Sequence, residues 1–436
     1  MTTIASTTGG VAAAPSVLDR AVSKVKWRIL PLFVVMFIAN YIDRVNIGFV
    51  RSHLEKDLGI GAAAFGFGAG IFFLAYAVFE VPSNILQQRF GAKAWLTRIM
   101  ATWGIVATGM AFVQGETSFY IVRFLLGVAE AGFFPGVVYY FTQWLPNSER
   151  GKAMAIFLSG SALASVISGP LSGALLSIQG GGFHGWQWMF VIEGLASVAL
   201  CFVVWFFLDS RPEDAKWLSN EERRELAAVI EAERKERDAN RPPHASMFSL
   251  LKDSRIALFC LIFFAIQLTI YGATFWLPSI IKKMGQFSEF EIGLFNSIPW
   301  IISIAAMYMF ATLAQKHRNQ QAWVAVALIV AACGMFASTT GGPVFAFVAI
   351  CFAAIGFKAA SSLFWPIPQG YLDSRIAAAV IALINSLGNL GGFVAPATFG
   401  YLEQKTGSIQ GGLYALSAAS VIAAGLIFLT RGRKSA

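Results

Sequence analysis

Residues 118–141 read SFYIVRFLLGVAEAGFFPGVVYYF, an apolar run that contains one arginine, Arg123, and one glutamate, Glu130. A helix of about 20 mainly apolar residues is long enough to cross the hydrocarbon core of a bilayer. The run therefore predicts a membrane-spanning helix. An ionisable side chain at the bilayer centre costs at least ~2.5–3.5 kcal/mol on insertion scales, so we expect Arg123 and Glu130 to face the protein interior.

Eleven further runs of this kind follow the same pattern. Together they predict twelve membrane-spanning helices, at roughly 27–50, 65–87, 94–114, 118–141, 152–178, 186–208, 255–281, 290–313, 321–339, 343–366, 376–400 and 412–430. The composition agrees, because 56% of the residues are hydrophobic and only 13% are charged, against about 25% charged residues in soluble proteins. Four cysteines in 436 residues exclude a disulfide-rich secreted scaffold.

The longest hydrophilic segment falls after the sixth run and contains the capping-box pattern Ser219-Asn220-Glu221-Glu222. The sequence thus predicts an all-α integral membrane protein made of two six-helix bundles. The expected parts are a disordered N-terminal tail (1–26), a first bundle (27–208), a central loop with an amphipathic helix (209–253), a second bundle (254–430) and a short C-terminal tail (431–436).

Lysine and arginine are concentrated in alternate connecting segments, which begin with the N-terminal one and include 209–253. By the positive-inside rule this bias predicts that both termini are cytoplasmic. The formal net charge of +9 is then a sign of topology and does not indicate a nucleic-acid partner.

A weak internal repeat relates the two halves. Phe133-Phe134-Pro135 in the fourth run matches Phe364-Trp365-Pro366 in the tenth. The two bundles are therefore expected to be pseudosymmetric, as in many transporters whose binding site lies where the repeats meet. In this alignment Lys358 takes the place of Gly127, and Ser361 takes the place of Glu130.

Ionisable residues at membrane depth are the main functional candidates. Arg123, Gly127 and Glu130 are spaced i, i+4, i+7 and share one helix face, and Asp43 and Arg44 lie in the first run. We expect these groups to line one cavity, the alternative being a purely structural ion-pair network. Lys358 faces that cavity or, alternatively, extends to the cytoplasmic surface.

Several other polar residues have more than one possible role. Tyr76 and Glu80 share a helix face, and Glu80 is a candidate gate or loop contact. Asn385 and Asn389 would bind substrate or join two helices by a hydrogen bond. Ser161, Ser165 and Ser168 favour close helix packing. No histidine lies at membrane depth, and no nucleotide-binding loop, metal-ligand cluster or nucleophile elbow is present, so we expect no enzyme activity, metal or cofactor.

The segment 84–93, NILQQRFGAK, resembles the loop signature of the major facilitator superfamily. It keeps Arg89, Gly91 and Lys93, which the resemblance assigns to that gating loop, together with nearby Glu80. It departs from the signature at Asn84, Gln88 and Ala92, and the position of Gln88 is acidic in the family.

Further stretches resemble the anion:cation symporters within that superfamily, most of all the tartrate and phthalate permeases. These stretches are NYIDR at 40–44, EVPSN at 80–84, RFLLG at 123–127 with Glu130, and INSLGN at 384–389. The resemblance implies that Asp43 and Glu130 carry coupled protons. It implies substrate-binding roles for Tyr41, Arg44, Tyr76, Arg123, Asn385 and Asn389, whereas Lys358 and Ser361 rest on the repeat alone.

We therefore expect a monomeric, proton-coupled symporter that takes up small organic carboxylates across a bacterial inner membrane by alternating access. Its partners would be the anion, protons and the lipid bilayer. Lys358 suggests a second carboxylate on the substrate. The alternatives are a symporter of sugar acids such as hexuronate or galactonate, and an anion exchanger or channel-like facilitator.

Overall fold

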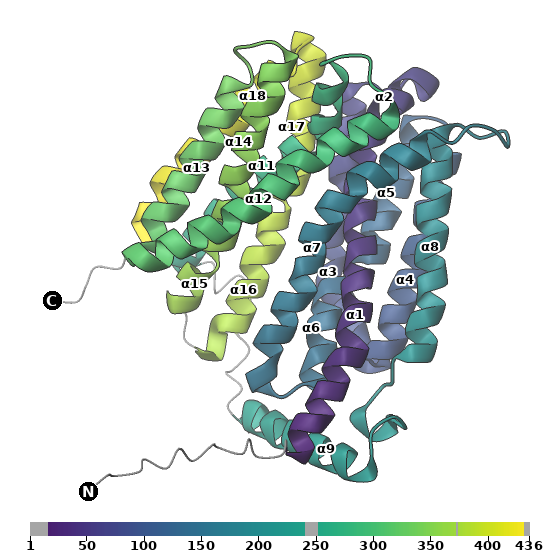
Figure 1. Cartoon of the computed structure of the whole chain (residues 1–436), viewed down its shortest axis with the longest axis vertical. Coiled ribbons are helices and arrows are strands. Elements are labelled where there is room, and N and C mark those ends of the chain that lie inside the picture. The colour runs from purple at the N-terminus through teal and green to yellow at the C-terminus, as the bar shows by residue number, and fades with distance from the viewer. Residues whose placement is uncertain (1–15, 240–251, 372–373, 431–436) are drawn as a thin grey trace, which may run out of the picture.

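The computed structural model describes residues 16–239, 252–371 and 374–430, and these are almost entirely helical (Figure 1). The first bundle contains α1 (Val17–Val45), α2 (Ile47–Leu58), α3 (Ala62–Phe90), α4 (Ala92–Gly109), η1 (Met110–Phe112), α5 (Glu116–Glu130), α6 (Phe133–Trp144), α7 (Asn147–Leu176) and α8 (Gly185–Phe207). The connecting segment contains η2 (Pro212–Asp214) and α9 (Asn220–Ala239). The second bundle contains α11 (Ser254–Lys282), α12 (Glu289–His317), α13 (Gln320–Ala337), α14 (Pro343–Phe364), α15 (Pro366–Tyr371), α16 (Ser374–Asn389), α17 (Gly391–Thr406), α18 (Gln410–Leu426) and η3 (Ile427–Thr430).

In the described part of the chain, eleven helical segments are long and apolar enough to cross a membrane. The predicted third span, 94–114, corresponds to α4 and η1, whose first two turns carry Lys93 and Arg98 and make this segment less apolar than the other spans. α4 packs against α5 and α8, so it belongs to the same bundle as the longer helices. The predicted fold class, an all-α membrane protein, is confirmed.

The run 118–141 is not one continuous helix. α5 ends at Glu130, and Gly132 adopts φ 88°, a left-handed conformation that favours glycine. The Ser83 hydroxyl donates a hydrogen bond of 2.6 Å to the Ala131 carbonyl at this break. A Cβ at position 132 would collide with the Ser83 hydroxyl. Glu130 therefore lies at a helix end, where its position is fixed by the break.

The predicted tail 1–26 is wrong at its inner boundary, because α1 already begins at Val17. The Ser16 side chain caps the helix, and the Asp19 backbone amide donates to its hydroxyl over 3.1 Å. Ala21, Val22 and Val25 are buried, and α1 packs against α9. Residues 17–26 are thus an ordered helix that joins the first bundle to the connecting segment, while residues 1–15 lie outside the described residues.

Ion pairs hold this junction together. Lys24 lies 2.8 Å from Glu222 on α9, and Arg150 on α7 lies 2.7 Å from Glu233. The Lys24 ammonium is the main reason that the pKa of the Glu222 carboxyl lies below its ordinary value. α9 therefore packs along one end of the first bundle, which we call the α9 end (Figure 1).

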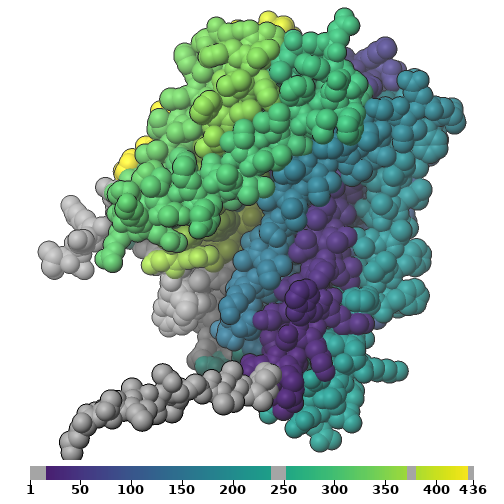
Figure 2. Space-filling model, viewed as in Figure 1, coloured from purple at the N-terminus to yellow at the C-terminus, as the bar shows by residue number. Residues whose placement is uncertain are grey.

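The two bundles are joined most closely at the opposite end, which we call the α2 end. Figure 2 shows the surfaces of α7 and α12 in contact along the front of the molecule. Arg51 on α2 lies 2.7 Å from Glu403 on α17. Further contacts between the bundles at this end are Arg51–Ser279, Lys282–Ser52, Ala63–Gln404 and His53–Glu289. The structure is therefore closed at its α2 end.

Glycines allow the bundle surfaces to approach within backbone distance. A Cβ added to Gly169 on α7 would collide with the Gly293 carbonyl on α12, and a Cβ at Gly293 would collide with the Gly169 carbonyl. In the second contact, between α3 and α17, a Cβ at Gly66 would collide with the Pro396 carbonyl, and a Cβ at Gly400 would collide with the Ala62 carbonyl. Small residues of this kind permit close packing of helices in membranes.

We predict that Gly169→Ala opens the α2 end, because the added methyl group cannot fit against the α12 backbone. Spin labels at Ser177→Cys and Gln286→Cys, in a Cys333→Ser background, would report the separation of α7 and α12 by pulsed electron paramagnetic resonance. The distance distribution should shift to longer values. Gly425→Ala is the matched control, since a Cβ there meets no atom within 4 Å, and an unchanged distribution in Gly169→Ala would contradict this packing.

Candidate functional site

An ion pair inside the first bundle is the centre of the site. The Arg44 Nε lies 2.9 Å from the Glu130 Oε2, and Asn40 Nδ2 donates to the same oxygen over 2.8 Å. Asn40 and Arg44 are one helical turn apart on α1, and Glu130 is the last residue of α5. All three side chains are buried. The arrangement brings together two residues that the sequence placed in one cavity.

The pair keeps unused hydrogen-bonding capacity. The Glu130 Oε1 and the Arg44 Nη2 are buried and have no hydrogen-bond partner within the described residues. A buried polar atom without a partner is costly, and such an atom in a native site calls for an explanation. A ligand or a proton that enters here would satisfy these two atoms.

Aromatic rings surround the guanidinium of Arg44. Its Cζ lies 4.6 Å from the centre of the Tyr76 ring and 5.6 Å from that of Phe72. Tyr271 of the second bundle interacts with Arg44 as well, and its ring packs at an angle of 56° against Phe73, with 4.4 Å between ring centres. Arg44 therefore lies beside the junction of the two bundles and contacts Tyr76, to which the resemblance assigns a substrate-binding role.

Arg123 occupies a different environment. It is fully buried, and its Nε and Nη2 donate to the backbone carbonyls of Gly68 and Ala69 on α3, over 3.3 and 3.2 Å. Its Cζ lies 4.9 Å from the Phe72 ring, so the guanidinium groups of Arg44 and Arg123 both contact this ring. Arg123 thus joins α5 to α3 and adds positive charge near Glu130.

Asp43 points away from Arg44 toward the interior of the first bundle. The Trp103 indole N–H and the Ser197 hydroxyl donate to its Oδ2, the latter over 3.3 Å. Glu193 lies nearby and accepts a hydrogen bond of 2.6 Å from Asn46. No Lys or Arg of the described residues lies within 4.0 Å of either carboxylate. Asp43 and Glu193 form a second acidic group, separate from the Arg44–Glu130 pair.

Lys358 lies at the junction from the opposite side. Its Nζ is 5.8 Å from the Tyr41 ring of α1 and 5.1 Å from the Trp300 ring of α12, within the range of cation–π attraction. Within the described residues it has neither a hydrogen bond nor an ion pair. This placement beside α1 favours the cavity-facing interpretation of Lys358 over extension to the membrane surface.

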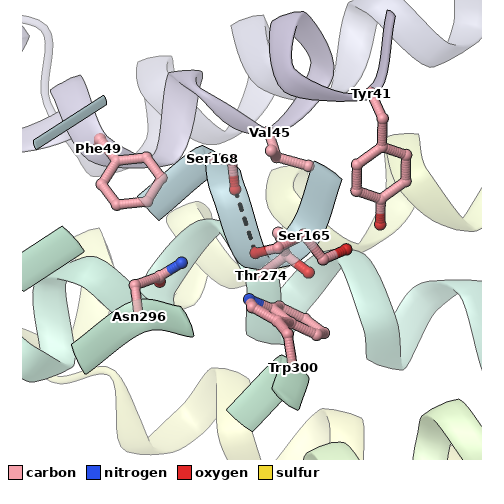
Figure 3. A pocket seen from close by; sticks show the side chains of 8 residues that line it. All are labelled: Tyr41, Val45, Phe49, Ser165, Ser168, Thr274, Asn296 and Trp300. Carbon is pink, nitrogen blue, oxygen red and sulfur yellow. Dashed lines mark hydrogen bonds between the residues drawn. The ribbon is translucent and has the colours of Figure 1, made fainter. Parts of the chain in front are cut away.

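A pocket continues from these two rings toward the α2 end (Figure 3). Its volume of about 10 Å³ holds a group about the size of one water molecule, and it lies between α1, α7, α11 and α12. Its lining residues are Tyr41, Val45, Phe49, Ser165, Ser168, Thr274, Asn296 and Trp300. Tyr41 was expected at the site, Ser165 and Ser168 had been interpreted as packing residues, and Asn296 was not singled out.

The remaining sequence candidates lie outside this pocket. Ser386 donates to Glu80 over 2.8 Å and so joins α16 to α3 across the junction, which fits a gating contact. Asn389 accepts a hydrogen bond of 3.2 Å from Gln267. This contact joins α16 to α11, as in the alternative in which Asn389 links two helices. Asn385 and Ser361 are half-buried.

The loop signature lies at the turn between α3 and α4. Gly91 adopts φ 86° there, which ends α3. Arg89 lies 5.8 Å from the Phe90 ring, and Lys93 lies 5.1 Å from the Trp205 ring on α8. These three residues are therefore part of the first bundle's surface and do not contact the Arg44–Glu130 pair.

Comparison with known proteins identifies the family. The sequence model of the Major Facilitator Superfamily matches residues 32–396. The chain is 42% identical to the "Quinolone resistance transporter" of Acinetobacter baumannii, covering 90% of this chain and 91% of that one. It is 42% identical to a "Putative tartrate transporter" of Agrobacterium vitis, with 93% of both chains covered, and 36% identical to the "Inner membrane transport protein RhmT" of Escherichia coli, with 95% and 96% covered.

Solved structures show the same fold. The inward-open xylose transporter XylE from E. coli matches with a TM-score of 0.75 at 13% identity, covering 94% of this chain and 97% of that chain. A bacterial homologue of the lysosomal transporter Spinster matches with a TM-score of 0.74 at 18% identity, covering 93% and 97%. The chain belongs to the major facilitator superfamily and is a multi-pass membrane transporter, not an enzyme.

Proposed function

We propose that this transporter is a proton-coupled symporter of small organic carboxylates in a bacterial inner membrane. The observation that carries the proposal is the buried Arg44–Glu130 pair, which keeps one free guanidinium nitrogen and one free carboxylate oxygen. The α9 end is then cytoplasmic, as the distribution of lysine and arginine predicts. The closed α2 end then faces the periplasm.

Competition between the substrate carboxylate and Glu130 for Arg44 couples the transport of the anion to the transport of protons. Arginine binds carboxylates through parallel N–H···O bonds, so a substrate carboxylate and the ionised Glu130 compete for the same guanidinium. Protonation of Glu130 removes the competitor and favours the anion. Loss of the proton on the cytoplasmic side restores the ion pair and releases the substrate. Each ligand thus changes the affinity for the other by the same factor.

The neighbouring charges strengthen this preference. The group made of Asp43, Arg44, Arg123, Glu130 and Lys358 carries a net charge of +1 when both carboxylates are ionised and +3 when both are protonated. Asp43 is the second proton carrier in this scheme. It acts on the anion through the electrostatic field, since its hydrogen bonds go to Trp103 and Ser197.

The relatives and the site suggest which carboxylates are carried. Two relatives from Agrobacterium vitis bear names that refer to tartrate, and they match over 93% of this chain. Lys358 provides a second cation across the junction from Arg44, which fits a second carboxylate on the substrate. The relative named for quinolone resistance makes export of an aromatic drug the second candidate. The guanidinium of Arg44 and the ammonium of Lys358 favour the small anion.

Glu130→Gln tests the coupling, because glutamine resembles the protonated side chain and no longer competes for Arg44. The variant should still bind tartrate and exchange it across proteoliposome membranes, but it should lose accumulation driven by a pH gradient. Glu116→Gln, an exposed change on the same helix, is the control. If Glu130→Gln still concentrated substrate against a gradient, Glu130 would have only a structural role.

Lys358→Ala tests the second carboxylate contact. Charge-assisted hydrogen bonds are worth ~1.5–3 kcal/mol, so the variant should bind a dicarboxylate roughly tenfold or more weakly, with little change for the matching monocarboxylate. Isothermal titration calorimetry would measure both affinities. Lys405→Ala, on α17, is the control. Equal changes for the two ligands would remove Lys358 from the binding site.

A further inference from the structure

The pocket next to Lys358 has a chemistry of its own. Apart from the phenol of Tyr41, none of its lining side chains is ionisable. Polar groups enter it from both bundles, with Ser165 and Ser168 from α7, Thr274 from α11, and Asn296 from α12 (Figure 3). A neutral, polar part of a ligand would therefore fit here better than a carboxylate or an aromatic ring.

The hydroxyl protons in the pocket are already used within their own helices. Ser165 donates to the Ser161 carbonyl over 2.9 Å, Ser168 to the Ser165 carbonyl over 3.3 Å, and Thr274 to the Ile270 carbonyl over 2.7 Å. Each hydroxyl oxygen still has acceptor capacity. Toward a ligand in the pocket, these three hydroxyl groups therefore act as hydrogen-bond acceptors.

Asn296 is an independent sign of a ligand. The residue is only 4% exposed, and its Oδ1 is buried without a hydrogen-bond donor in the described part of the chain. Figure 3 shows its amide turned toward the middle of the pocket. Leaving a buried carbonyl oxygen unpaired is costly, and a donor from a ligand would remove that cost.

Two of the residues that line the pocket also contact Lys358. Tyr41 and Trp300 line the pocket, and the Lys358 ammonium lies 5.8 and 5.1 Å from their rings. A carboxylate bound by Lys358 would therefore place its neighbouring carbon atoms at the entrance. A hydroxyl group on those carbons both donates and accepts, which the amide of Asn296 and the hydroxyl oxygens match.

We propose that the pocket between α1, α7, α11 and α12 is a hydroxyl-binding subsite, which selects hydroxylated carboxylates over hydroxyl-free carboxylates of the same length. This inference rests on the proposed carboxylate transport and specifies its substrate class. A site built to bond a hydroxyl group discriminates strongly against an analogue that lacks it, because the polar groups of the site are then left unpaired.

The test compares tartrate with succinate, which differ only in two hydroxyl groups. Calorimetry with the purified full-length protein should show that the wild type binds tartrate more tightly than succinate. Thr274→Val is nearly isosteric and removes one acceptor, and Asn296→Leu removes the unpaired amide. Each variant should lose roughly three- to tenfold in tartrate affinity, while its succinate affinity stays within about twofold of the wild-type value.

Thr312→Val is the matched control, because the Thr312 hydroxyl also donates to its own helix, at an exposed site on the same α12 that carries Asn296. Size-exclusion chromatography would show that each variant is folded, and Thr274→Val alone decides the matter if Asn296→Leu does not fold. Equal losses for both ligands, or a wild type that prefers succinate, would overturn the subsite while carboxylate transport stands. If the wild type bound neither anion, the proposed function itself would fail, and the subsite with it.

Discussion

The buried pair of Arg44 and Glu130 is the interaction on which the site depends. A charge at membrane depth is tolerated when it is paired inside the protein, and this pair is formed only because α5 stops at Glu130 and α1 presents Arg44 and Asn40 on one face. The helix break at Gly132 therefore serves the site directly. It is stabilised in turn by the hydroxyl of Ser83.

The remaining polar groups fall into two sets, one inside the first bundle and one at the junction between the bundles. Asp43 and Glu193 face the interior of the first bundle, and Arg123 binds the backbone of α3. Lys358 and the polar pocket lie at the junction with the second bundle. A small anion held between Arg44 and Lys358 would touch both bundles, so its binding can be linked to their relative movement about the glycine contacts.

Apolar run length and charge patterning predicted the helical membrane fold. The i, i+4, i+7 spacing placed Arg123 and Glu130 on one helix face, and Arg44 was expected in the same cavity. What the sequence could not show depends on contacts between distant residues. The break after Glu130 lies in an uninterrupted apolar run, and the helical residues 17–26 are charged but pack against α9. The partners of Asp43 come from α4 and α8. Asn296 is recognisable in the sequence as a polar residue within the apolar run 290–313. Its role as a possible ligand contact is visible only because the structure places it in the pocket.

The central claim is that substrate and the Glu130 carboxylate compete for Arg44. The most direct measurement is the number of protons taken up when tartrate binds to the purified wild-type protein, obtained by calorimetry in buffers that differ in ionisation enthalpy. Displacement of Glu130 from Arg44 predicts net uptake, approaching about one proton per bound anion at a pH where the free pair is ionised. Tight binding with no proton uptake across the pH range would contradict the account.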